Sequence, residues 1–330
     1  MKYVYVLVSS ENDLYYEQAL MSVWSLRFRM PGAHIVVLCD DETEKGLCGK
    51  RDALRELATE IIAVPFEPSV KKVERSRLIK TAIPDYVDGD FLYIDCDTVI
   101  CDDLSSIENY KYEAAGVLDA HVRLDEHIHK NYFLARDKKL GFSGTKAAGC
   151  NINGGIILFR DTEYSRSLFK AWNEAWKYSA YKKHDLHDQS ALNEANFRTG
   201  LKMQLLPGEW NCQPSHGGLV FLKDAKIIHY FSSEFAGKYY IPYYRLADKA
   251  LQTRIKEAGG IPDDIQEMLR EPKFQFNPVH LVGDRRIQEM LQSPLAFSLF
   301  DLKVRMPHLF RALEKMAGFI RDSAKRLKRK

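Results

Sequence analysis

Short runs of β-forming residues alternate with helical segments in the first part of this chain, and this alternation constrains the fold more than any other feature. The expected strands lie at residues 3–8, 34–38, 61–64 and 91–94, and the expected helices between them at 15–30, 43–59 and 73–83. Because two neighbouring parallel strands need a long crossover, this alternation predicts a mostly parallel sheet with helices on both faces. We therefore predict an α/β fold with a Rossmann-like sheet.

Further apolar runs continue this pattern into the second half of the chain. Expected strands lie at 114–118, 154–159, 202–206 and 226–229, and expected helices lie at 165–178 and from within 184–193, the latter with acids in its first turn. The chain contains neither Gly-x-Gly-x-x-Gly nor Gly-x-x-x-x-Gly-Lys-Ser/Thr. A dinucleotide fingerprint and a P-loop are therefore excluded, and any diphosphate is held by other means.

Composition indicates an ordinary soluble protein. With 330 residues, the chain is long enough for two domains or for one large α/β domain with an appendage. Apolar residues make up 45% of it and the net charge is only +3, so no nucleic-acid partner is expected.

Six cysteines without a Cys-x-x-Cys pair are expected to be reduced. The apolar run at the amino terminus is too short for a signal peptide, and no run approaches the ~18 residues of a spanning helix. The expected location is the cytoplasm.

Two aspartates directly follow the predicted strand at 91–94, in the run Asp95-Cys96-Asp97. Open α/β sheets bind ligands at the carboxyl ends of their strands, where two carboxylates can face one divalent cation and the phosphate oxygens that it bridges. A structural role is an equal alternative, because Asp-x-Asp is a weak pattern. It also occurs at Asp88-Gly89-Asp90, before the same strand, where we interpret it as a turn.

Five blocks of residues, taken together and in this order, resemble glycosyltransferase family 8, which includes glycogenin and bacterial lipopolysaccharide galactosyl- and glucosyltransferases. The blocks are RLIK at 77–80, LYIDCDT at 92–98, NINGGI at 151–156, DQSALN at 188–193 and IHY at 228–230. The resemblance covers about residues 3–235. It implies a GT-A fold, a UDP-sugar donor, a divalent metal and retention of the anomeric configuration.

The resemblance also implies a set of metal ligands. Asp95 and Asp97 match the metal-binding pair of the family, and His229 matches its third protein ligand. Two carboxylates, one imidazole and two phosphate oxygens give a mostly oxygen shell that suits Mn²⁺ or Mg²⁺. His229 alone would be interpreted as a buried core histidine, so its assignment depends on the other blocks.

Residues of the donor site follow from the same resemblance. Those expected to bind the donor are Leu7, Ser9, Arg77, Lys80, Asp95, Asn153 and Lys238, and those expected nearest the reacting carbon are Asp119, Asp188 and Gln189. Arg77 and Lys80 lie one helical turn apart and can face one side, although a solvated helix face is an equal alternative for Lys80. Asp188 is expected to hold sugar hydroxyls.

Gln189 bears on the mechanism. A double displacement with retention needs a carboxylate nucleophile near the anomeric carbon, and the Gln189 amide is a poor one. We therefore expect a front-face route, in which the acceptor hydroxyl enters beside the departing UDP and its proton passes to a phosphate oxygen.

Two segments depart from the family pattern. Family members often carry a small acidic or amide residue in the first loop to hold the uridine, and the aligned positions here are Leu7, Ser9 and Glu11. The family run His-x-x-Gly-x-x-Lys is also absent after His229, where Ser232 replaces the glycine. Lys238, reached through a longer loop, either takes the role of the diphosphate lysine or leaves it unfilled.

Several histidines outside these blocks could be mistaken for zinc ligands. They are His121, His127, His129, His184 and His187. No cysteine lies at a zinc-ligand spacing from them, so we expect solvated loop residues.

The carboxyl-terminal part of the chain is expected to form a separate region. We predict a catalytic domain over residues 1–250, with the acceptor side at about 115–250, and a smaller helical region over 251–330. Within that region, residues 307–330 combine apolar positions at helical spacing with a basic remainder, as in a basic amphipathic helix. Such a helix either lies on an anionic membrane surface, here the inner face of the plasma membrane, or packs on its own domain.

The expected activity is that of a UDP-sugar-dependent retaining hexosyltransferase. UDP-glucose or UDP-galactose would be the donor, and a cell-surface glycan or lipid-linked saccharide the acceptor. A sugar nucleotidyltransferase is one alternative, although such enzymes typically have a glycine-rich, basic first loop and Ser9-Ser10-Glu11-Asn12-Asp13 is acidic. A non-catalytic, membrane-associated glycan-binding protein on a transferase fold is the other.

Overall fold

The structure is a computed structural model that describes residues 1–231, 243–277 and 290–327, with side chains to residue 319. The chain divides into two compact units. The first comprises residues 1–232 and 244–276, and the second comprises 233–243 and 277–330.

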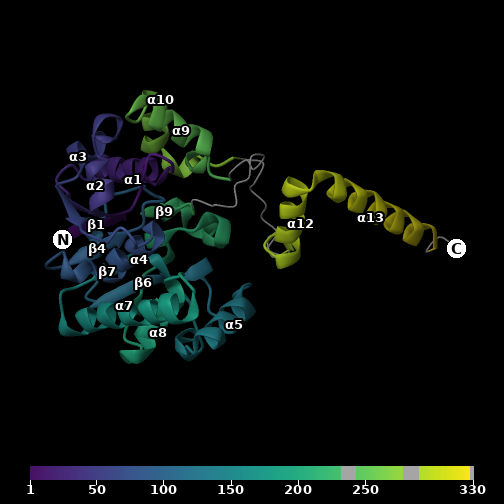
Figure 1. Cartoon of the computed structure of the whole chain (residues 1–330), viewed down its shortest axis with the longest axis horizontal. Helices are drawn as coiled ribbons and strands as arrows, with labels where there is room; N and C mark the ends of the chain where they lie inside the picture. Colours follow the sequence, from purple (N-terminus) through teal and green to yellow (C-terminus); the bar gives the residue numbers. More distant parts are fainter. Residues whose placement is uncertain (232–242, 278–289, 328–330) are drawn as a thin grey trace. The chain divides into compact units, whose positions relative to one another are not determined.

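A seven-stranded sheet forms the centre of the first unit (Figure 1). In spatial order its strands are β3 (Glu60–Val64), β2 (His34–Asp40), β1 (Lys2–Leu7), β4 (Phe91–Ile94), β7 (Ile152–Phe159), β6 (Ala114–Leu118) and β8 (Gln204–Leu205). β7 runs antiparallel to both of its neighbours, and all other pairs are parallel. The predicted α/β fold with a mostly parallel sheet is therefore confirmed.

Helices cover both faces of this sheet. The α-helices described in unit 1 are α1 (Tyr15–Arg29), α2 (Asp41–Lys45), α3 (Ala53–Leu57), α4 (Lys72–Thr81), α5 (Lys130–Leu140), α6 (Gly144–Ala148), α7 (Glu163–Lys183), α8 (Gln189–Arg198), α9 (Lys249–Ala258) and α10 (Asp263–Arg270), of which α9 and α10 pack on α1. Side chains alternate across a strand, so Val4 of β1 joins one core with Ile79 of α4 and Trp172 of α7. On the other face, the hydroxyl of Tyr5 lies 3.3 Å from that of Ser22 in α1. Burial on both faces explains why the parallel strands are almost continuously apolar.

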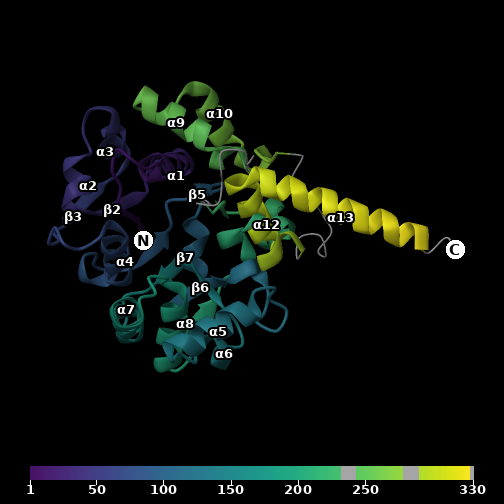
Figure 2. The same ribbon diagram turned by 45° about the vertical axis from the view of Figure 1, so that its right-hand side comes forward.

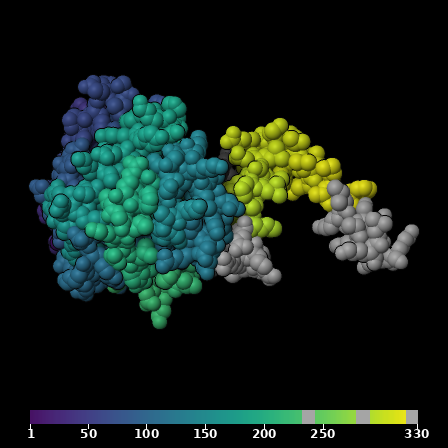
Figure 3. All heavy atoms as spheres, turned by 90° about the horizontal axis from the view of Figure 1, so that it is seen from below, coloured from purple at the N-terminus to yellow at the C-terminus, as the bar shows by residue number. Residues whose placement is uncertain are grey.

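The side of the molecule that carries α7 and α8 is built from the middle of the chain. In the view from below, residues coloured in shades of teal make up most of the surface of the first unit (Figure 3). Turning the ribbon by 45° shows α5, α6 and α8 gathered on this side (Figure 2). α7 buries Trp172 and Trp176 against this part of the core, and its first turn is capped by the Thr162 hydroxyl, which accepts from the amide of Ser165.

Two predicted helices differ from the observed ones. The single helix expected at 43–59 is divided into α2 and α3, because the chain turns at Gly46 and passes through Gly49 with a φ of +57°. The helix expected from within 184–193 begins at Gln189, inside that range, but the acids expected in its first turn precede it instead. Residues 184–188 form a loop, since His184 adopts a left-handed conformation that ends α7.

A second, two-stranded sheet was not predicted. β5 (Thr98–Ile100) pairs antiparallel with β9 (Ile227–His229), with Thr98 opposite His229. Three residues are too few to show a hydrophobic period, so this pairing has no clear signal in the sequence.

The second unit contains the helices α12 (Pro294–Arg305) and α13 (Pro307–Leu327). The helix expected at 307–330 is therefore helical through Leu327. α9 and α10 belong to the first unit, whereas the sequence-based division placed residues 251–276 with the carboxyl-terminal region. That division at residue 250 stays a prediction. Within the described residues, no helix is both long and apolar enough to span a membrane.

A buried ion pair fixes the end of β2, and its removal should destabilise the protein. Arg75 Nη1 lies 2.9 Å from Asp40 Oδ2, and the two side chains are 4% and 1% exposed. In Arg75→Met the carboxylate of Asp40 stays buried without its cation, so we expect the free energy of unfolding to fall by about 3 kcal/mol. Urea unfolding measures this change.

Arg254→Met is the matched control. Arg254 pairs with Asp264 at 2.9 Å, but the two side chains are 53% and 60% exposed. This variant should lose less than about 1 kcal/mol. Equal losses in the two variants would contradict the role assigned to Arg75.

Candidate active site

The polar residues of the candidate site gather at one edge of the seven-stranded sheet. Asp95 directly follows β4, and Asp119 directly follows β6. β7 runs the other way, so Asn153 near its start reaches the same edge. The carboxyl ends of parallel strands are the usual binding edge of an α/β sheet, as expected for Asp95 from the sequence.

Asp95, Asp97 and His229 converge at this edge. One ligand atom from each side chain lies within 4.8 Å of the others, and Asp97 Oδ1 is 3.2 Å from His229 Nε2. The pairing of β5 with β9 brings residues 97 and 229 together although they are distant in the sequence. In a search of the described residues for clusters of acids, histidines or cysteines that could hold a metal ion, these three residues are the cluster found. Two carboxylates and one imidazole suit Mn²⁺ or Mg²⁺.

A hydrogen bond on its far side orients the His229 ring. Nδ1 lies 3.1 Å from Asn211 Oδ1, and the Asn211 amide donates to Asn153 Oδ1 at 2.9 Å. His229 Nδ1 therefore carries a proton, and Nε2 faces Asp97, where it could bind a metal ion when unprotonated. A side chain at Gly155 would place a Cβ 2.4 Å from Cε1 of this ring, so only glycine leaves room for it.

The same chain of amides continues to Asp119. Asn153 Nδ2 donates to Asp119 Oδ1 at 3.3 Å, and Asn151 Nδ2 donates to Asp119 Oδ2 at 3.1 Å. His127 Nε2 lies 3.5 Å from Asp119 Oδ2. His127 is 4% exposed, so the expectation of a solvated loop histidine is wrong for this residue. His229 and Asp119 are thus linked through Asn211 and Asn153.

Cations from α4 form the other half of the site. Lys80 Nζ lies 3.1 Å from Asp95 Oδ1 and 3.1 Å from Asp188 Oδ2. Arg77 Nε lies 3.4 Å from Asp188 Oδ1. Arg77 and Lys80 do face one side, and for Lys80 the alternative of a solvated helix face is wrong, since its side chain is only 4% exposed.

These contacts fix the charges at the site. Burial acts to raise the pKa of Asp188, but Arg77 and Lys80 outweigh burial and hold that pKa below its usual range. Burial acts to lower the pKa of Lys80, but Asp188 and Asp95 raise it overall. The pKa of His229 is likewise raised, because Asp97 outweighs the effect of burial. Asp188 is therefore ionised and Lys80 protonated at neutral pH.

Comparison with known families decides the class of protein. The model of glycosyl transferase family 8 matches residues 32–234, which is more than half of the chain. The chain belongs to this family. The assignment made from five sequence blocks is confirmed, and the protein is a glycosyltransferase with the GT-A fold.

Solved glycosyltransferases resemble this family 8 chain in fold, at low sequence identity. The bifunctional glycosyltransferase WbbM matches with a TM-score of 0.51 and 17% identity, over 78% of this chain and 51% of its own. The galactosyltransferase LgtC, solved with donor and acceptor sugar analogs, gives 0.49 and 16%, over 81% and 99%. Mouse xyloside xylosyltransferase 1 gives 0.47 and 14%, over 69% and 96%. This chain thus covers about half of WbbM. No curated protein sequence matches it.

Three further residues predicted for the donor site, Leu7, Ser9 and Gln189, lie near the same edge of the sheet and differ in burial and hydrogen bonding. Gln189 is the first residue of α8 and half-buried. Leu7 ends β1 and is 1% exposed. The Ser9 hydroxyl donates to Asp13 Oδ1 at 2.6 Å and accepts from Arg51 at 2.8 Å, so its bonds are internal. Lys238 lies outside the described residues.

The sequence analysis missed Tyr93 and Asn211 as members of this family 8 site. The Tyr93 hydroxyl donates to Asp95 Oδ1. Residues i and i+2 of a strand share a face, so the proximity of Tyr93 to Asp95 could have been inferred. Asn211 accepts from His229 Nδ1 and donates to Asn153 Oδ1. Its link between His229 and Asn153 depends on non-local packing and has no sequence signal.

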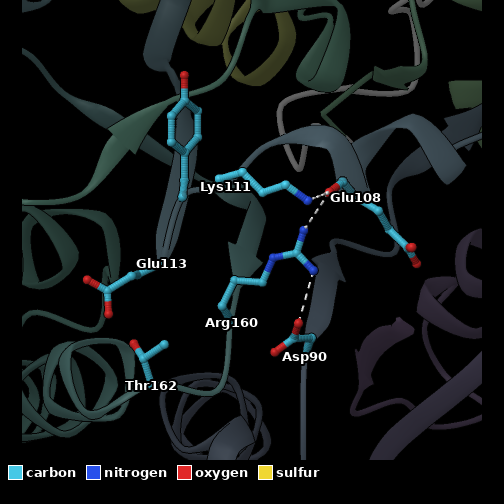
Figure 4. Close-up of a pocket in the computed structure, with 7 residues that line it drawn as sticks. Asp90, Glu108, Lys111, Glu113, Arg160 and Thr162 are labelled. Carbon is cyan, nitrogen blue, oxygen red and sulfur yellow. Dashed lines mark hydrogen bonds and ion pairs between the residues drawn. The ribbon is translucent and has the colours of Figure 1, made fainter.

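A separate open hollow of about 370 Å³ lies at the opposite edge of the sheet (Figure 4). Its lining includes Asp90, which precedes β4, and Arg160, which follows β7. Arg160 Nη1 donates to Asp90 Oδ2 at 2.9 Å, and its Nη2 donates to backbone carbonyls at 3.2 and 3.1 Å. The polar groups there bond to one another, so we assign the hollow a structural role. Asp90 also belongs to the run interpreted as a turn.

Histidines near Asp119 should make the folded state sensitive to acid. Burial lowers the pKa of His216 to about 4, although Asp119 acts to raise it, from an ordinary value of 6.5. Between these values the unfolded chain binds a proton that the folded chain does not. The free energy of unfolding therefore falls as pH falls from 6.5 to about 4, by up to ~1.4 kcal/mol per pH unit for this group.

His216→Gln should reduce that loss. The measurement is urea unfolding at several pH values across this window. His308→Gln, which removes an exposed histidine from α13, is the control. If His216→Gln and wild type lose stability equally between pH 6.5 and 4, the assignment is wrong.

Proposed function

We propose that the protein is a metal-dependent, retaining hexosyltransferase that uses UDP-glucose or UDP-galactose. The acceptor would be a hydroxyl of a cell-surface glycan or lipid-linked saccharide. The convergence of Asp95, Asp97 and His229 in a chain of glycosyltransferase family 8 is the observation that carries this proposal. An acidic site of this kind can bind the diphosphate of a nucleotide sugar through a shared divalent cation.

In this proposal, Asp95, Asp97 and His229 hold Mn²⁺ or Mg²⁺. Held by these residues, such an ion would supply the Lewis acidity that neutralises charge on a departing diphosphate. Asn211 keeps Nε2 of His229 aimed at the ion by accepting from Nδ1. The support for a metal lies in the donor set and in the distances of at most 4.8 Å between ligand atoms.

The sugar would lie between Asp119, Asp188 and Gln189. Asn153 and His127 hold the Asp119 carboxylate, and Arg77 and Lys80 hold that of Asp188. Two fixed carboxylates can accept hydrogen bonds from sugar hydroxyls and orient the ring. Arg77, whose side chain is 34% exposed, would reach the diphosphate.

Gln189 supports a front-face route. Its amide is a poor nucleophile, and the neighbouring Asp188 carboxylate is already paired with two cations. The acceptor hydroxyl would attack on the side that UDP leaves. Its proton would pass to a phosphate oxygen, and the bond from the anomeric carbon to the phosphate oxygen would break. Detection of a glycosyl group covalently attached to a side chain would contradict this route.

Loss of Asp97 should abolish metal-dependent turnover. For Asp97→Asn we expect release of UDP from UDP-sugars in the presence of Mn²⁺ to fall by about 100-fold or more, because one metal ligand loses its charge. The assay covers UDP-glucose, UDP-galactose and their N-acetyl forms. A donor screen by thermal stabilisation of the wild type identifies the sugar to use.

Asp88→Asn is the control for this experiment. Asp88 is an exposed acid in the other Asp-x-Asp run, at the opposite edge of the sheet, and its loss should leave turnover unchanged. Wild-type activity in Asp97→Asn would refute the proposed metal site. Absence of turnover in the wild type with every donor would favour the non-catalytic alternative.

The second unit supports a peripheral attachment to the inner face of the plasma membrane. Large apolar side chains are exposed along α12 and α13: Leu295, Phe297, Leu299, Phe300, Val304, Met306, Leu309, Met316 and Phe319. Arg311 and Lys315 are also exposed on α13. Apolar and basic side chains on one helix suit the interface of an anionic membrane. The side chains of residues 320–330 lie outside the described part of the chain.

Removal of residues 307–330 should reduce binding to anionic vesicles. Each basic residue near such a surface contributes about 1 kcal/mol, so we expect most of the wild-type binding to be lost. Co-sedimentation with vesicles of phosphatidylcholine and phosphatidylserine measures this, and vesicles of phosphatidylcholine alone are the control. Equal binding by the full chain and the shortened chain would exclude this role.

A further inference from the structure

Lys80 occupies an unusual position for a lysine. It projects from α4 into the candidate site, and its side chain is 4% exposed, against 34% for Arg77 one turn away. A buried ammonium group is costly unless carboxylates compensate its charge. The position of Lys80 therefore depends on the acids around it.

Three groups surround the Lys80 ammonium. Nζ lies 3.1 Å from Asp95 Oδ1, 3.1 Å from Asp188 Oδ2 and 5.0 Å from the centre of the Tyr93 ring. Lys80 thus contacts both Asp95, which is one of the three proposed metal ligands, and Asp188, the carboxylate expected at the donor sugar. Arg77 forms an ion pair with Asp188, and none is found between Arg77 and the proposed metal ligands Asp95 and Asp97.

The two carboxylate oxygens of Asp95 accept different hydrogen bonds. Oδ1 accepts from the Tyr93 hydroxyl and from Lys80 Nζ at 3.1 Å, whereas Oδ2 accepts a longer hydrogen bond from the same Nζ at 3.5 Å. A carboxylate whose first oxygen accepts two hydrogen bonds offers chiefly the second to a cation. Asp95 is therefore positioned to bind a metal through one oxygen.

Lys80 also changes the charge balance. Asp95, Asp97 and Asp188 supply three negative charges, and Arg77 and Lys80 supply two positive ones. These five groups sum to one negative charge, and to two without Lys80; the charges of Asp119 and His229 add to both sums equally, so loss of Lys80 makes the site more negative by one charge. A weaker negative field attracts a divalent cation less, but it also repels the phosphates of a donor less.

We propose that Lys80 is a positioning residue that weakens metal binding to the donor-free protein and favours joint binding of metal and nucleoside diphosphate. It limits Asp95 to one oxygen and removes one negative charge. A diphosphate then supplies the missing negative charge and the further oxygen ligands together. This inference rests on the proposed function, because it assumes that Asp95, Asp97 and His229 hold a metal.

Lys80→Met and Lys80→Gln test the proposal. Mn²⁺ affinity is measured without nucleotide, from the electron paramagnetic resonance signal of free Mn²⁺, and UDP affinity is measured at saturating Mn²⁺ by calorimetry. Loss of the positive charge should tighten Mn²⁺ binding by about tenfold or more, and weaken UDP binding by a similar factor. Opposite changes in the two affinities distinguish this role from a general loss of structure, which would weaken both.

Two further variants serve as controls. Lys80→Arg keeps the charge and should keep both affinities near those of the wild type. Lys72→Met removes an exposed lysine from the first turn of the same helix and should change neither. Lys80→Gln retains donors for both carboxylates, so it provides a folded neutral variant if Lys80→Met unfolds, as checked by thermal unfolding.

The outcomes separate the two proposals. Unchanged or weaker Mn²⁺ binding in folded Lys80→Met and Lys80→Gln overturns the role of Lys80, while Mn²⁺ binding by the wild type would still support the metal site. If the wild type binds Mn²⁺ neither alone nor together with UDP, and Asp97→Asn behaves identically, the proposed metal site fails and the inference fails with it.

Discussion

The pairing of β5 with β9 is the constraint on which the candidate site depends. β5 follows Asp97 directly, and the antiparallel register sets Thr98 opposite His229. Thr98 is itself fixed, since its hydroxyl lies 2.7 Å from that of Ser22 in α1 and donates to the carbonyl of Asp95 at 2.8 Å. A shift of one residue in this register would turn His229 to the other face of its strand. Three paired residues thus decide whether Asp97 and His229 meet.

The reversed strand β7 has a comparable influence. Its start lies where β4 and β6 end, so its first residues reach the edge that carries Asp95 and Asp119. Asn153 bonds to Asp119 and Asn211 there, and Gly155 leaves the space that the His229 ring fills. The Gly155 carbonyl also accepts from the amide of Asp95 at 2.8 Å. The antiparallel strand β7 therefore supports both the proposed metal ligands Asp95 and His229 and the carboxylate of Asp119.

The sequence predicted the parallel part of the fold well, because buried strands and crossover helices leave strong local patterns. It did not predict the direction of β7 or the pairing of β5 with β9, since both depend on contacts between distant segments. The helix expected at 43–59 failed at Gly46 and Gly49, where the backbone turns. His127 was expected in solvent because a loop histidine shows no period that would reveal burial. For Lys80, helical spacing allowed either a face toward the site or a face toward solvent. The contacts of Lys80 with Asp95 and Asp188 show that it faces the site.

Two buried ionic groups in this protein differ in their charge balance, and this difference separates structure from function. At the end of β2, the charges of the buried Asp40 and Arg75 balance each other, and the exposed Glu42 also contacts Arg75 at 2.9 Å; stability alone can explain this arrangement. At the candidate site, Asp95, Asp97 and Asp188 lie near the two cations Lys80 and Arg77, Asp119 adds a fourth carboxylate, and His229 presents Nε2 to Asp97. Burying surplus charge is unfavourable for folding, and apolar side chains could pack the edge of a sheet at lower cost. A surplus of negative charge beside an oriented imidazole is therefore better explained by binding of a divalent cation than by folding.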